Sequence, residues 1–199
     1  MSNPRIAIIL GSTRPGRNGR AVAEWVEAAA SLRDDAVFEL IDLKDHPLPL
    51  LDEAVPAAAG KYANDHTKAW AAVVDRFDGY IFVTPEYNHS TSGVLKNAID
   101  YVYGEWNNKA AAFVSYGTAG GVRAVEHLRL IAAELQLATV RQQVTFSLVS
   151  DFKDYHLFTP GGGHTARAEV MFDQLIAWTT AMRGVREALK EAAEERPAD

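Results

Sequence analysis

The sequence contains no cysteine, so disulfide bonds, thiolate catalysis and cysteine metal sites are all excluded. Long apolar runs are also missing, and no window approaches the roughly 18 consecutive apolar residues of a membrane-spanning helix. Acidic residues outnumber basic ones, and the net charge is -6. This charge argues against a nucleic-acid-binding surface, which needs a basic face. The first apolar run meets a glycine too early for a signal peptide. We therefore expect a cytoplasmic protein that binds neither membranes nor nucleic acids.

Two kinds of catalytic motif are missing as well. The six histidines are scattered, without His-x-x-x-His or His-Glu-x-x-His spacing, so we expect no metal site. Gly-x-Ser-x-Gly is absent, and Ser115 has no histidine and acid at recognisable spacing, so a hydrolase nucleophile is not expected. Apolar residues make up 48% of the chain and charged residues 23%, as in ordinary globular proteins. No repeat or linker divides the chain, which predicts one domain over residues 1–199 with a charged tail from about residue 190.

Five short apolar runs predict buried strands. They are Arg5–Leu10, Val37–Leu43, Gly79–Thr84, Ala110–Tyr116 and Thr139–Phe146. Segments with helical period lie between them, for example Trp70, Val73, Val74 and Phe77 on one helix face. Strands that alternate with helices indicate βαβ units, so we predict an α/β fold. Its form is a doubly wound, five-stranded parallel sheet of order 2-1-3-4-5 with helices on both faces.

Two further segments complete the expected organisation. The proline-containing stretch Lys44–Gly60 shows little period and is expected to form a long loop. A final helix is expected from about Thr165 to about Lys190, followed by a charged end that frays. Its apolar stripe would consist of Val170, Met171, Leu175, Trp178, Met182 and Val185.

The loop "GSTRPGRNGR" after the first predicted strand has the composition of a phosphate site. Its polar and charged members include Ser12, Thr13, Arg14, Arg17 and Asn18, and its glycines are Gly11, Gly16 and Gly19. The following helix offers free amides and the positive end of its dipole. The loop is neither a P-loop nor Gly-x-Gly-x-x-Gly. The alternative is a capped surface turn with stray arginines.

Two more unusual loops follow the third and fourth predicted strands. "TPEYNHS" crowds Pro85, Glu86, Tyr87 and Asn88 together, and "SYGTAGGVR" contains Ser115 and three glycines, Gly117, Gly120 and Gly121. The second of these, taken alone, also fits an ordinary glycine turn. Ligands of such sheets bind beyond the carboxyl ends of the strands, where these loops meet. A phosphate at one end and a broad, polar-edged ring at the other predict bound FMN.

The runs "GSTRP…N", "PEYNHSTSGVLKNAIDY" and "SYGTAGGVRAVEHLR" resemble the NADPH-dependent FMN reductase family, a flavodoxin-like group that includes quinone, chromate and azo-dye reductases. The resemblance runs from about Arg5 to about Phe146. It implies that Ser12, Arg14 and Asn18 contact the phosphate and that Pro85, Glu86, Tyr87 and Asn88 wrap the ribityl chain and ring. Ser115, Gly117, Gly120 and Gly121 would line the other side of the ring. Members often have serine where Arg17 stands, and many have proline where Ser92 stands.

The resemblance implies an NAD(P)H-dependent oxidoreductase that passes hydride from NADPH or NADH through FMN to a quinone, another redox compound or free flavin. No side chain is required as catalyst, because the cofactor carries the chemistry. Glu86 is expected to position groups rather than to act as acid or base, and His89 is either a proton donor or an exposed loop residue. The first rival is a flavodoxin-type electron carrier without its own substrate, and the second is a flavin-binding regulatory module without turnover.

Assembly into a homodimer or homotetramer is also expected. In the family the helix that carries Lys96 and Asp100 packs against a partner subunit, and here it would present a mixed dimer surface; the alternative is that Lys96, Asn97 and Asp100 form only a solvated face. The rings of Tyr101, Tyr103 and Trp106 would either cover the flavin of the partner or form a packed helix end.

Overall fold

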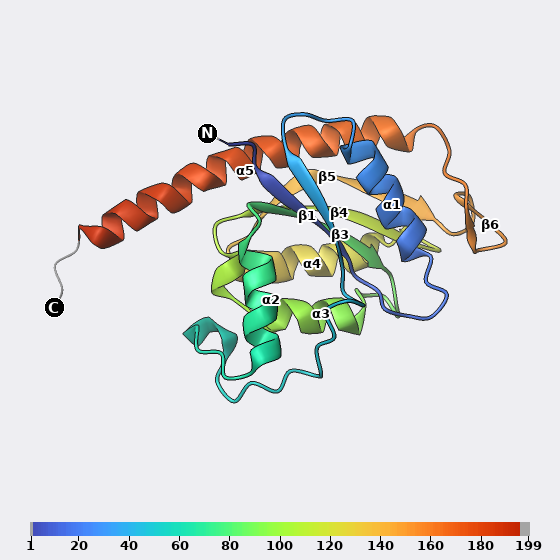
Figure 1. Ribbon diagram of the computed structural model, residues 1–199. Coiled ribbons are helices and arrows are strands. Elements are labelled where there is room, and N and C mark those ends of the chain that lie inside the picture. Colours follow the sequence, from blue (N-terminus) through green and yellow to red (C-terminus); the bar gives the residue numbers. More distant parts are fainter. Residues whose placement is uncertain (1, 196–199) are drawn as a thin grey trace.

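A five-stranded parallel sheet forms the centre of the computed structural model, which describes residues 2–195 (Figure 1). The strand order is β2-β1-β3-β4-β5, so the predicted order is confirmed. The strands are β1 (Arg5–Leu10), β2 (Val37–Asp42), β3 (Gly79–Pro85), β4 (Ala110–Gly117) and β5 (Ala138–Ser147). Every residue of β3 and β4 is buried, which explains their unbroken apolar runs.

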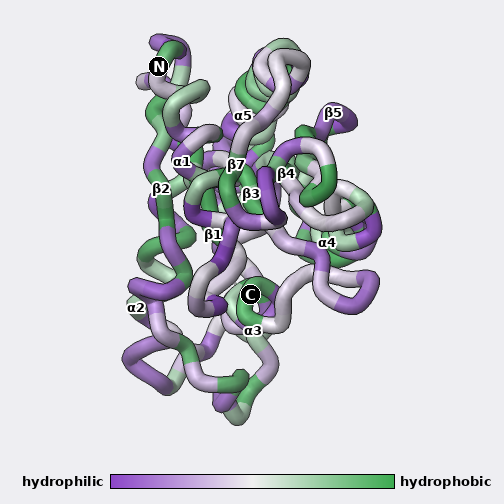
Figure 2. The backbone as a smooth tube through the Cα atoms, turned by 90° about the vertical axis from the view of Figure 1, so that its right-hand side faces the viewer, coloured by the Kyte–Doolittle hydropathy of each residue, from purple (hydrophilic) through white to green (hydrophobic). Residues whose placement is uncertain are grey.

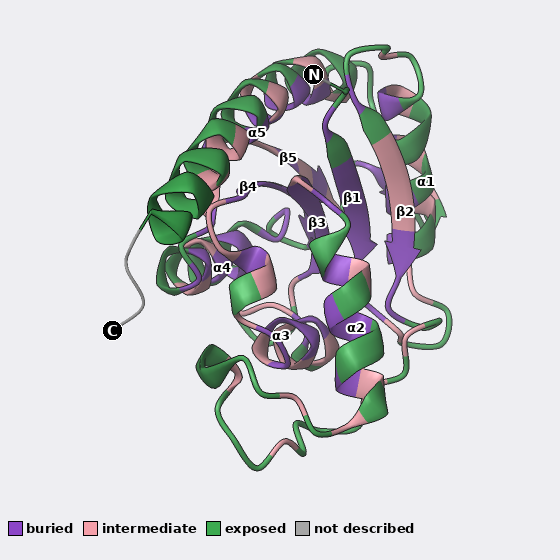
Figure 3. Cartoon of the chain, turned by 60° about the vertical axis from the view of Figure 1, so that its left-hand side comes forward, coloured by how far each residue is buried: buried purple, intermediate pink, exposed green. Residues whose placement is uncertain are grey.

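Helices cover both faces of this sheet, as Figure 3 shows by the buried colour of the strands between them. One face carries α1 (Gly19–Ala30) and α5 (His164–Glu194), and the other carries α2 (Asp65–Asp75), α3 (Gly93–Asp100) and α4 (Val122–Glu134). Alternate strand residues feed the two cores, with Ile6 and Ile8 on the α1–α5 side and Ala7 and Ile9 on the other. Short 3-10 turns span Ala57–Ala59 and Gly104–Trp106, and a hairpin joins β6 (Phe152–Lys153) to β7 (Leu157–Phe158).

The predicted loop Lys44–Gly60 is confirmed except for the 3-10 turn within it, and it is fastened to α3. Asn97 Nδ2 donates to the Pro49 carbonyl at 2.7 Å, and Asn97 Oδ1 accepts from the Leu51 amide at 3.0 Å. Lys96 and Asp100 form an ion pair with each other along the same helix. Asn97 therefore serves internal packing, whereas Lys96 and Asp100 remain partly exposed.

α5 differs from its predicted form in two ways. It continues past Lys190 to Glu194, and residues 196–199 of the predicted fraying end lie outside the described part of the chain. Met171 and Leu175 are buried as expected, but Trp178 and Val185 are 46% and 40% exposed. The buried face of α5 consists instead of Ala168, Met171, Phe172, Leu175 and Thr179, so Trp178 lies off this face. The last part of α5 runs beyond the sheet (Figure 1). Val170, in the first half of the helix, is also 46% exposed, so the predicted stripe is correct for Met171 and Leu175 but not for Val170, Trp178 or Val185.

The aromatic residues after α3 form a packed helix end rather than a cover for a partner's flavin. Tyr101 and Trp106 are fully buried. The Trp106 ring lies 4.7 Å from that of Tyr80, near the amino end of β3, and its Nε1 donates to the Ile99 carbonyl at 3.1 Å. Of the two alternatives, the packed helix end is therefore the one that the structure favours, because Trp106 packs at the amino edge of the sheet.

Hydropathy is mixed along the helices, which carry both purple and green segments in Figure 2. Among the described residues, no helix combines the length and apolar character needed to cross a membrane. The same residues include no group of three or more His, Asp or Glu placed to hold a metal ion.

Candidate cofactor site

The three unusual loops meet at one edge of the sheet, because β1, β3 and β4 are parallel neighbours. Ligands of open α/β sheets bind at this carboxyl edge, near the point where the strand order reverses. We call residues 11–18 the phosphate loop, residues 86–92 the β3 loop and residues 118–121 the β4 loop. The structure thus brings all predicted cofactor residues to one region of the molecule.

Side chains tie the phosphate loop to the β3 loop. Ser12 Oγ and the Tyr87 hydroxyl are 3.1 Å apart and share a hydrogen bond. Ser92 Oγ accepts from the Leu95 amide at 3.2 Å, which caps α3, and it also donates to the Gly11 carbonyl. Serine at position 92 therefore links two loops, which a proline could not do.

The tip of the β3 loop is a tight turn. Tyr87 and Ser90 exchange backbone hydrogen bonds of 2.9 and 3.1 Å around Asn88 and His89, whose φ angles are 47° and 73°. Left-handed conformations in residues other than glycine carry strain and gather at functional sites. Beside the tip, His127 Nδ1 of α4 lies 2.9 Å from Ser90 Oγ. The His89 side chain is exposed at this tip.

Glu86 joins the β3 loop to the start of α4. Its carboxylate accepts from the Arg123 amide at 3.1 Å and forms an ion pair with the Arg123 guanidinium. The Glu86 side chain is only 6% exposed, whereas Arg123 remains partly exposed. The Glu86 amide donates to the Tyr116 carbonyl at 3.0 Å. These contacts suit a positioning role better than acid–base catalysis.

Close backbone packing explains the glycines of the β4 loop. Gly120 and Gly121 have φ angles of 72° and 75°. A Cβ atom at Gly121 would lie 2.7 Å from Ser115 Cβ, and one at Gly117 would lie 3.2 Å from Glu86 Cβ. Ser115 Oγ is buried and donates to the Gly120 carbonyl at 2.7 Å. Ser115 therefore holds the shape of the loop through its side chain.

The Arg17 side chain is held between the phosphate loop and β2 by protein groups. Its guanidinium donates to both carboxylate oxygens of Asp42, one at 2.8 Å, and also to the Ser12 carbonyl. The two side chains are 11% and 7% exposed. Burial would raise the pKa of Asp42, but hydrogen bonds from Arg17 and the Lys44 amide outweigh it and hold that pKa below its usual value. Asp42, which the sequence analysis missed, thus ties the phosphate loop to β2.

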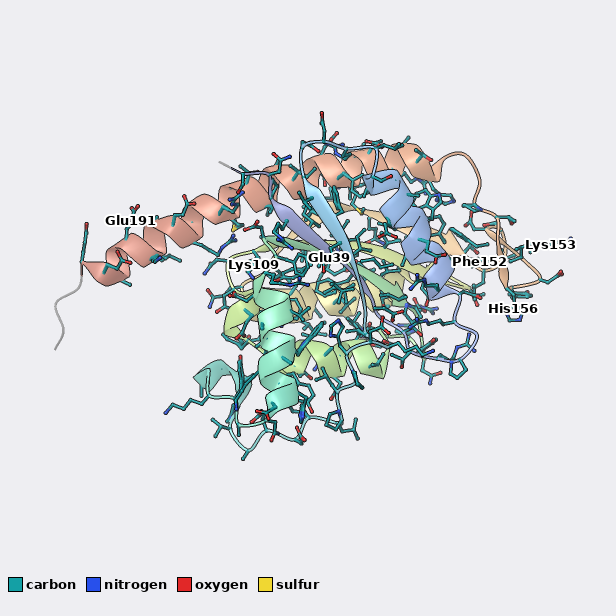
Figure 4. All side chains as sticks on the ribbon, in the orientation of Figure 1. Glu39, Lys109, Phe152, Lys153, His156 and Glu191 are labelled. Atoms are coloured by element: carbon teal, nitrogen blue, oxygen red, sulfur yellow. The ribbon has the colours of Figure 1, made fainter. Side chains whose placement is uncertain are left out.

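Arg14 and the start of α1 supply the available positive potential. The Arg14 side chain is exposed and has no hydrogen-bond or ion-pair partner among residues 2–195. The first turn of α1 contains no acidic residue, and the Asn18 side chain makes no capping bond. Instead Asn18 Nδ2 donates to the Tyr155 carbonyl at 2.7 Å. Tyr155 belongs to the turn of the β6–β7 hairpin, whose labelled residues Lys153 and His156 lie near the start of α1 in Figure 4.

Tyr116 is the second residue that sequence reasoning missed. It is 5% exposed, and its hydroxyl has no hydrogen-bond partner within the described residues. The nearby hydroxyl of Ser12 is bonded to Tyr87, and any side chain at Gly19 would overlap the Tyr116 hydroxyl. Burial raises the pKa of Tyr116, so the group stays protonated. An unsatisfied buried donor costs about 1–3 kcal/mol, and a phosphate oxygen would satisfy it. The residues at this end therefore fit the phosphate of FMN.

The fold and these loops define a flavodoxin-like mononucleotide-binding protein, and comparison with known proteins makes the class specific. The sequence model of the family described as NADPH-dependent FMN reductase matches residues 4–151. This chain belongs to that family, which confirms the resemblance, the dependence on FMN and the oxidoreductase class. The β6–β7 hairpin and α5 lie beyond the matched region.

Individual relatives agree with this assignment. An NAD(P)H-dependent FMN reductase of a Nectria species is 40% identical over 157 residues, which cover 74% of this chain and 78% of the relative. A 2-hydroxy-1,4-benzoquinone reductase of a Burkholderia species is 32% identical over 152 residues, covering 69% of this chain and 75% of the relative.

Solved structures agree on the fold. The flavoenzyme NAD(P)H:(acceptor) oxidoreductase FerB from Paracoccus denitrificans superposes with a TM-score of 0.68 at 20% identity, covering 90% of this chain and 98% of that one. Flavodoxin 1 from Bacillus cereus gives a TM-score of 0.53 at 16% identity, covering 89% and 97%.

Proposed function

We propose that this protein uses NADPH or NADH to reduce a small-molecule acceptor through FMN held at the carboxyl edge of the sheet. The acceptor is a quinone, another redox compound or free flavin. One observation supports this proposal above all: hydrogen bonds join the phosphate loop to the β3 loop, and the β4 loop lies beside them. Within the described residues, this region has an unpaired buried hydroxyl at one end and the glycine backbone of the β4 loop at the other. Quinone reductases among the relatives support the acceptor class.

The residues divide by the part of the cofactor they would meet. Ser12, Arg14, Asn18 and the amides from Gly19 onward would bind the phosphate. Arg17 would act indirectly, by holding the phosphate loop against Asp42. The ribityl chain and ring would lie against two sets of residues: Pro85, Glu86, Tyr87 and Asn88 on one side, and Ser115, Gly117, Gly120 and Gly121 on the other.

Bound FMN supplies the hydride chemistry, accepting reducing equivalents from NAD(P)H and releasing them to the acceptor. The chain contributes position and shape. The Glu86–Arg123 pair fixes the β3 loop against α4, and the glycines let the β4 loop pack closely against Glu86, Ser115 and Thr145. Donor and acceptor would bind in turn at the exposed side of the site, which gives ping-pong kinetics.

Anaerobic absorbance of the purified protein mixed with FMN tests this function. We expect a bound flavin band that bleaches when NADPH is added and returns when a quinone follows. A bound flavin that bleaches with neither NADPH nor NADH would indicate an electron carrier instead. Failure to bind FMN would refute the proposed site, and comparing kcat/KM for quinones with that for free flavin would identify the preferred acceptor.

We also propose that the chain acts in the cytoplasm as a homodimer or homotetramer. Exposed apolar side chains support assembly: Leu50 and Leu51 of the loop after β2 are 85% and 49% exposed, and Trp178 of α5 is 46% exposed. Light scattering during size-exclusion chromatography should give at least twice the mass of one chain. A monomer at micromolar concentration would contradict the assembly, and fractionation of cells would test the location.

A further inference from the structure

We propose that Tyr116 is a phosphate-binding residue of this site, whose hydroxyl donates a hydrogen bond to the FMN phosphate from beneath the phosphate loop. The inference rests on the proposed function and extends it to a residue of β4, the strand otherwise associated with the ring end of the site.

The position of the hydroxyl carries the inference. Tyr116 lies near the carboxyl end of β4, with its side chain in the core between the sheet and α1. Its hydroxyl lies directly against Gly19, the first residue of α1, since a side chain there would overlap it. A buried donor thus stands at the positive end of a helix dipole, where anions are bound.

The absence of a protein partner is the second observation. The hydroxyl is buried and makes no hydrogen bond to residues 2–195. Other buried tyrosines are satisfied: the Tyr80 hydroxyl donates to the Val74 carbonyl at 2.9 Å, and Tyr101 donates to the Pro49 carbonyl at 3.1 Å. Buried polar groups are almost always paired, so an unpaired donor beside free helix amides and Arg14 points to an anionic ligand.

The charge of the surroundings fits a phosphate. Arg14 is free and exposed, while Arg17 is neutralised by Asp42, so a dianion would find only one unpaired guanidinium in the loop. A neutral phenol adds a donor without adding charge. Because the phenol is neutral, it also needs no counter-ion when the site is empty, as a second free arginine would.

Tyr116→Phe tests the inference, because it removes one oxygen and keeps the ring in the core. Dissociation constants for FMN and for riboflavin, which lacks the phosphate, are measured by fluorescence quenching. We expect the variant to bind FMN about 10- to 100-fold more weakly, as for a lost bond to a charged group, with riboflavin affinity unchanged. The flavin-free variant should unfold at the same or higher urea concentration, because an unsatisfied donor has gone.

Tyr80→Phe is the matched control. Like Tyr116→Phe, it removes the buried hydroxyl of a tyrosine in the sheet. The Tyr80 hydroxyl, however, is hydrogen-bonded to the Val74 carbonyl and lies near the amino end of its strand. We expect lower stability and an unchanged ratio of FMN to riboflavin affinity. If Tyr116→Phe weakens both flavins equally, or neither, the inference is overturned. If the unaltered protein binds neither flavin, the proposed function fails instead.

Discussion

The pair of Arg17 and Asp42 allows a prediction with a worked magnitude. Arg17→Ala would remove the guanidinium and leave a carboxylate that is 7% exposed, with the Lys44 amide as its hydrogen-bond donor and Arg20 as a more distant ion-pair partner. Breaking a buried ion pair from one side costs about 3–5 kcal/mol. Arg20, 3.6 Å from Asp42 and half exposed, would move in and offset part of this cost. We therefore expect a loss of about 2–3 kcal/mol.

Thermal unfolding of the flavin-free protein measures this loss. For a chain of this size each kcal/mol corresponds to about 2–4 °C, so Tm should fall by about 5–10 °C. Asp42→Asn should have a similar effect, and the double variant should lose less than the sum of the two. FMN affinity should also fall in Arg17→Ala, because the phosphate loop is no longer held to β2.

The pH dependence gives an independent check. The folded-state pKa of Asp42 is lowered, so its contribution is present above the unfolded pKa of about 4 and is lost as pH falls through the lower folded value. Arg17→Ala should weaken this acid dependence. As a control, Arg5→Ala removes an exposed pair with Glu39 and should cost less than about 1 kcal/mol. Additive effects of Arg17→Ala and Asp42→Asn would refute the reasoning.

Three further predictions concern other parts of the site and the core. Ser92→Ala should cost about 1–2 kcal/mol in urea unfolding and weaken FMN binding, because it removes a helix cap and the bond to Gly11; an unchanged midpoint would contradict this. Gly121→Ala should lower Tm and FMN affinity because its Cβ meets the β4 backbone, whereas Gly93→Ala, with nothing within 4 Å, should do neither. Burial lowers the pKa of Lys109 (labelled in Figure 4) to about 8, so stability should rise by about 1–3 kcal/mol between pH 8 and 10.5, and Lys109→Met should abolish this rise in urea unfolding.

Local patterns predicted the sheet because the buried strands form short apolar runs, whereas the helices repeat apolar residues with the helical period. Strand order and the meeting of three loops then followed from the rules of parallel sheets. Where the strand ends differ from the prediction, they differ by one residue, for example at Pro85 and Gly117, where the chain stays extended through residues expected in loops.

The rest depends on contacts between segments far apart in the chain. Asp42 and Arg17 are 25 residues apart, and nothing near either residue in the sequence announces the pair. Tyr116 looks like another core aromatic until the position of its hydroxyl against Gly19 is known. Trp178 is exposed because the buried face of α5 runs through Phe172, Leu175 and Thr179, and the helical period alone does not distinguish this face from the predicted one.

The bonds between the loops have a consequence for the entropy of cofactor binding. Fixing a flexible residue costs about 1–2 kcal/mol in backbone freedom, so loops that a ligand must order weaken its affinity. Here Ser12–Tyr87, Ser92–Gly11 and Glu86–Arg123 are bonds between protein groups. The loops are therefore ordered when the protein folds, and their amides should resist hydrogen exchange before any flavin arrives.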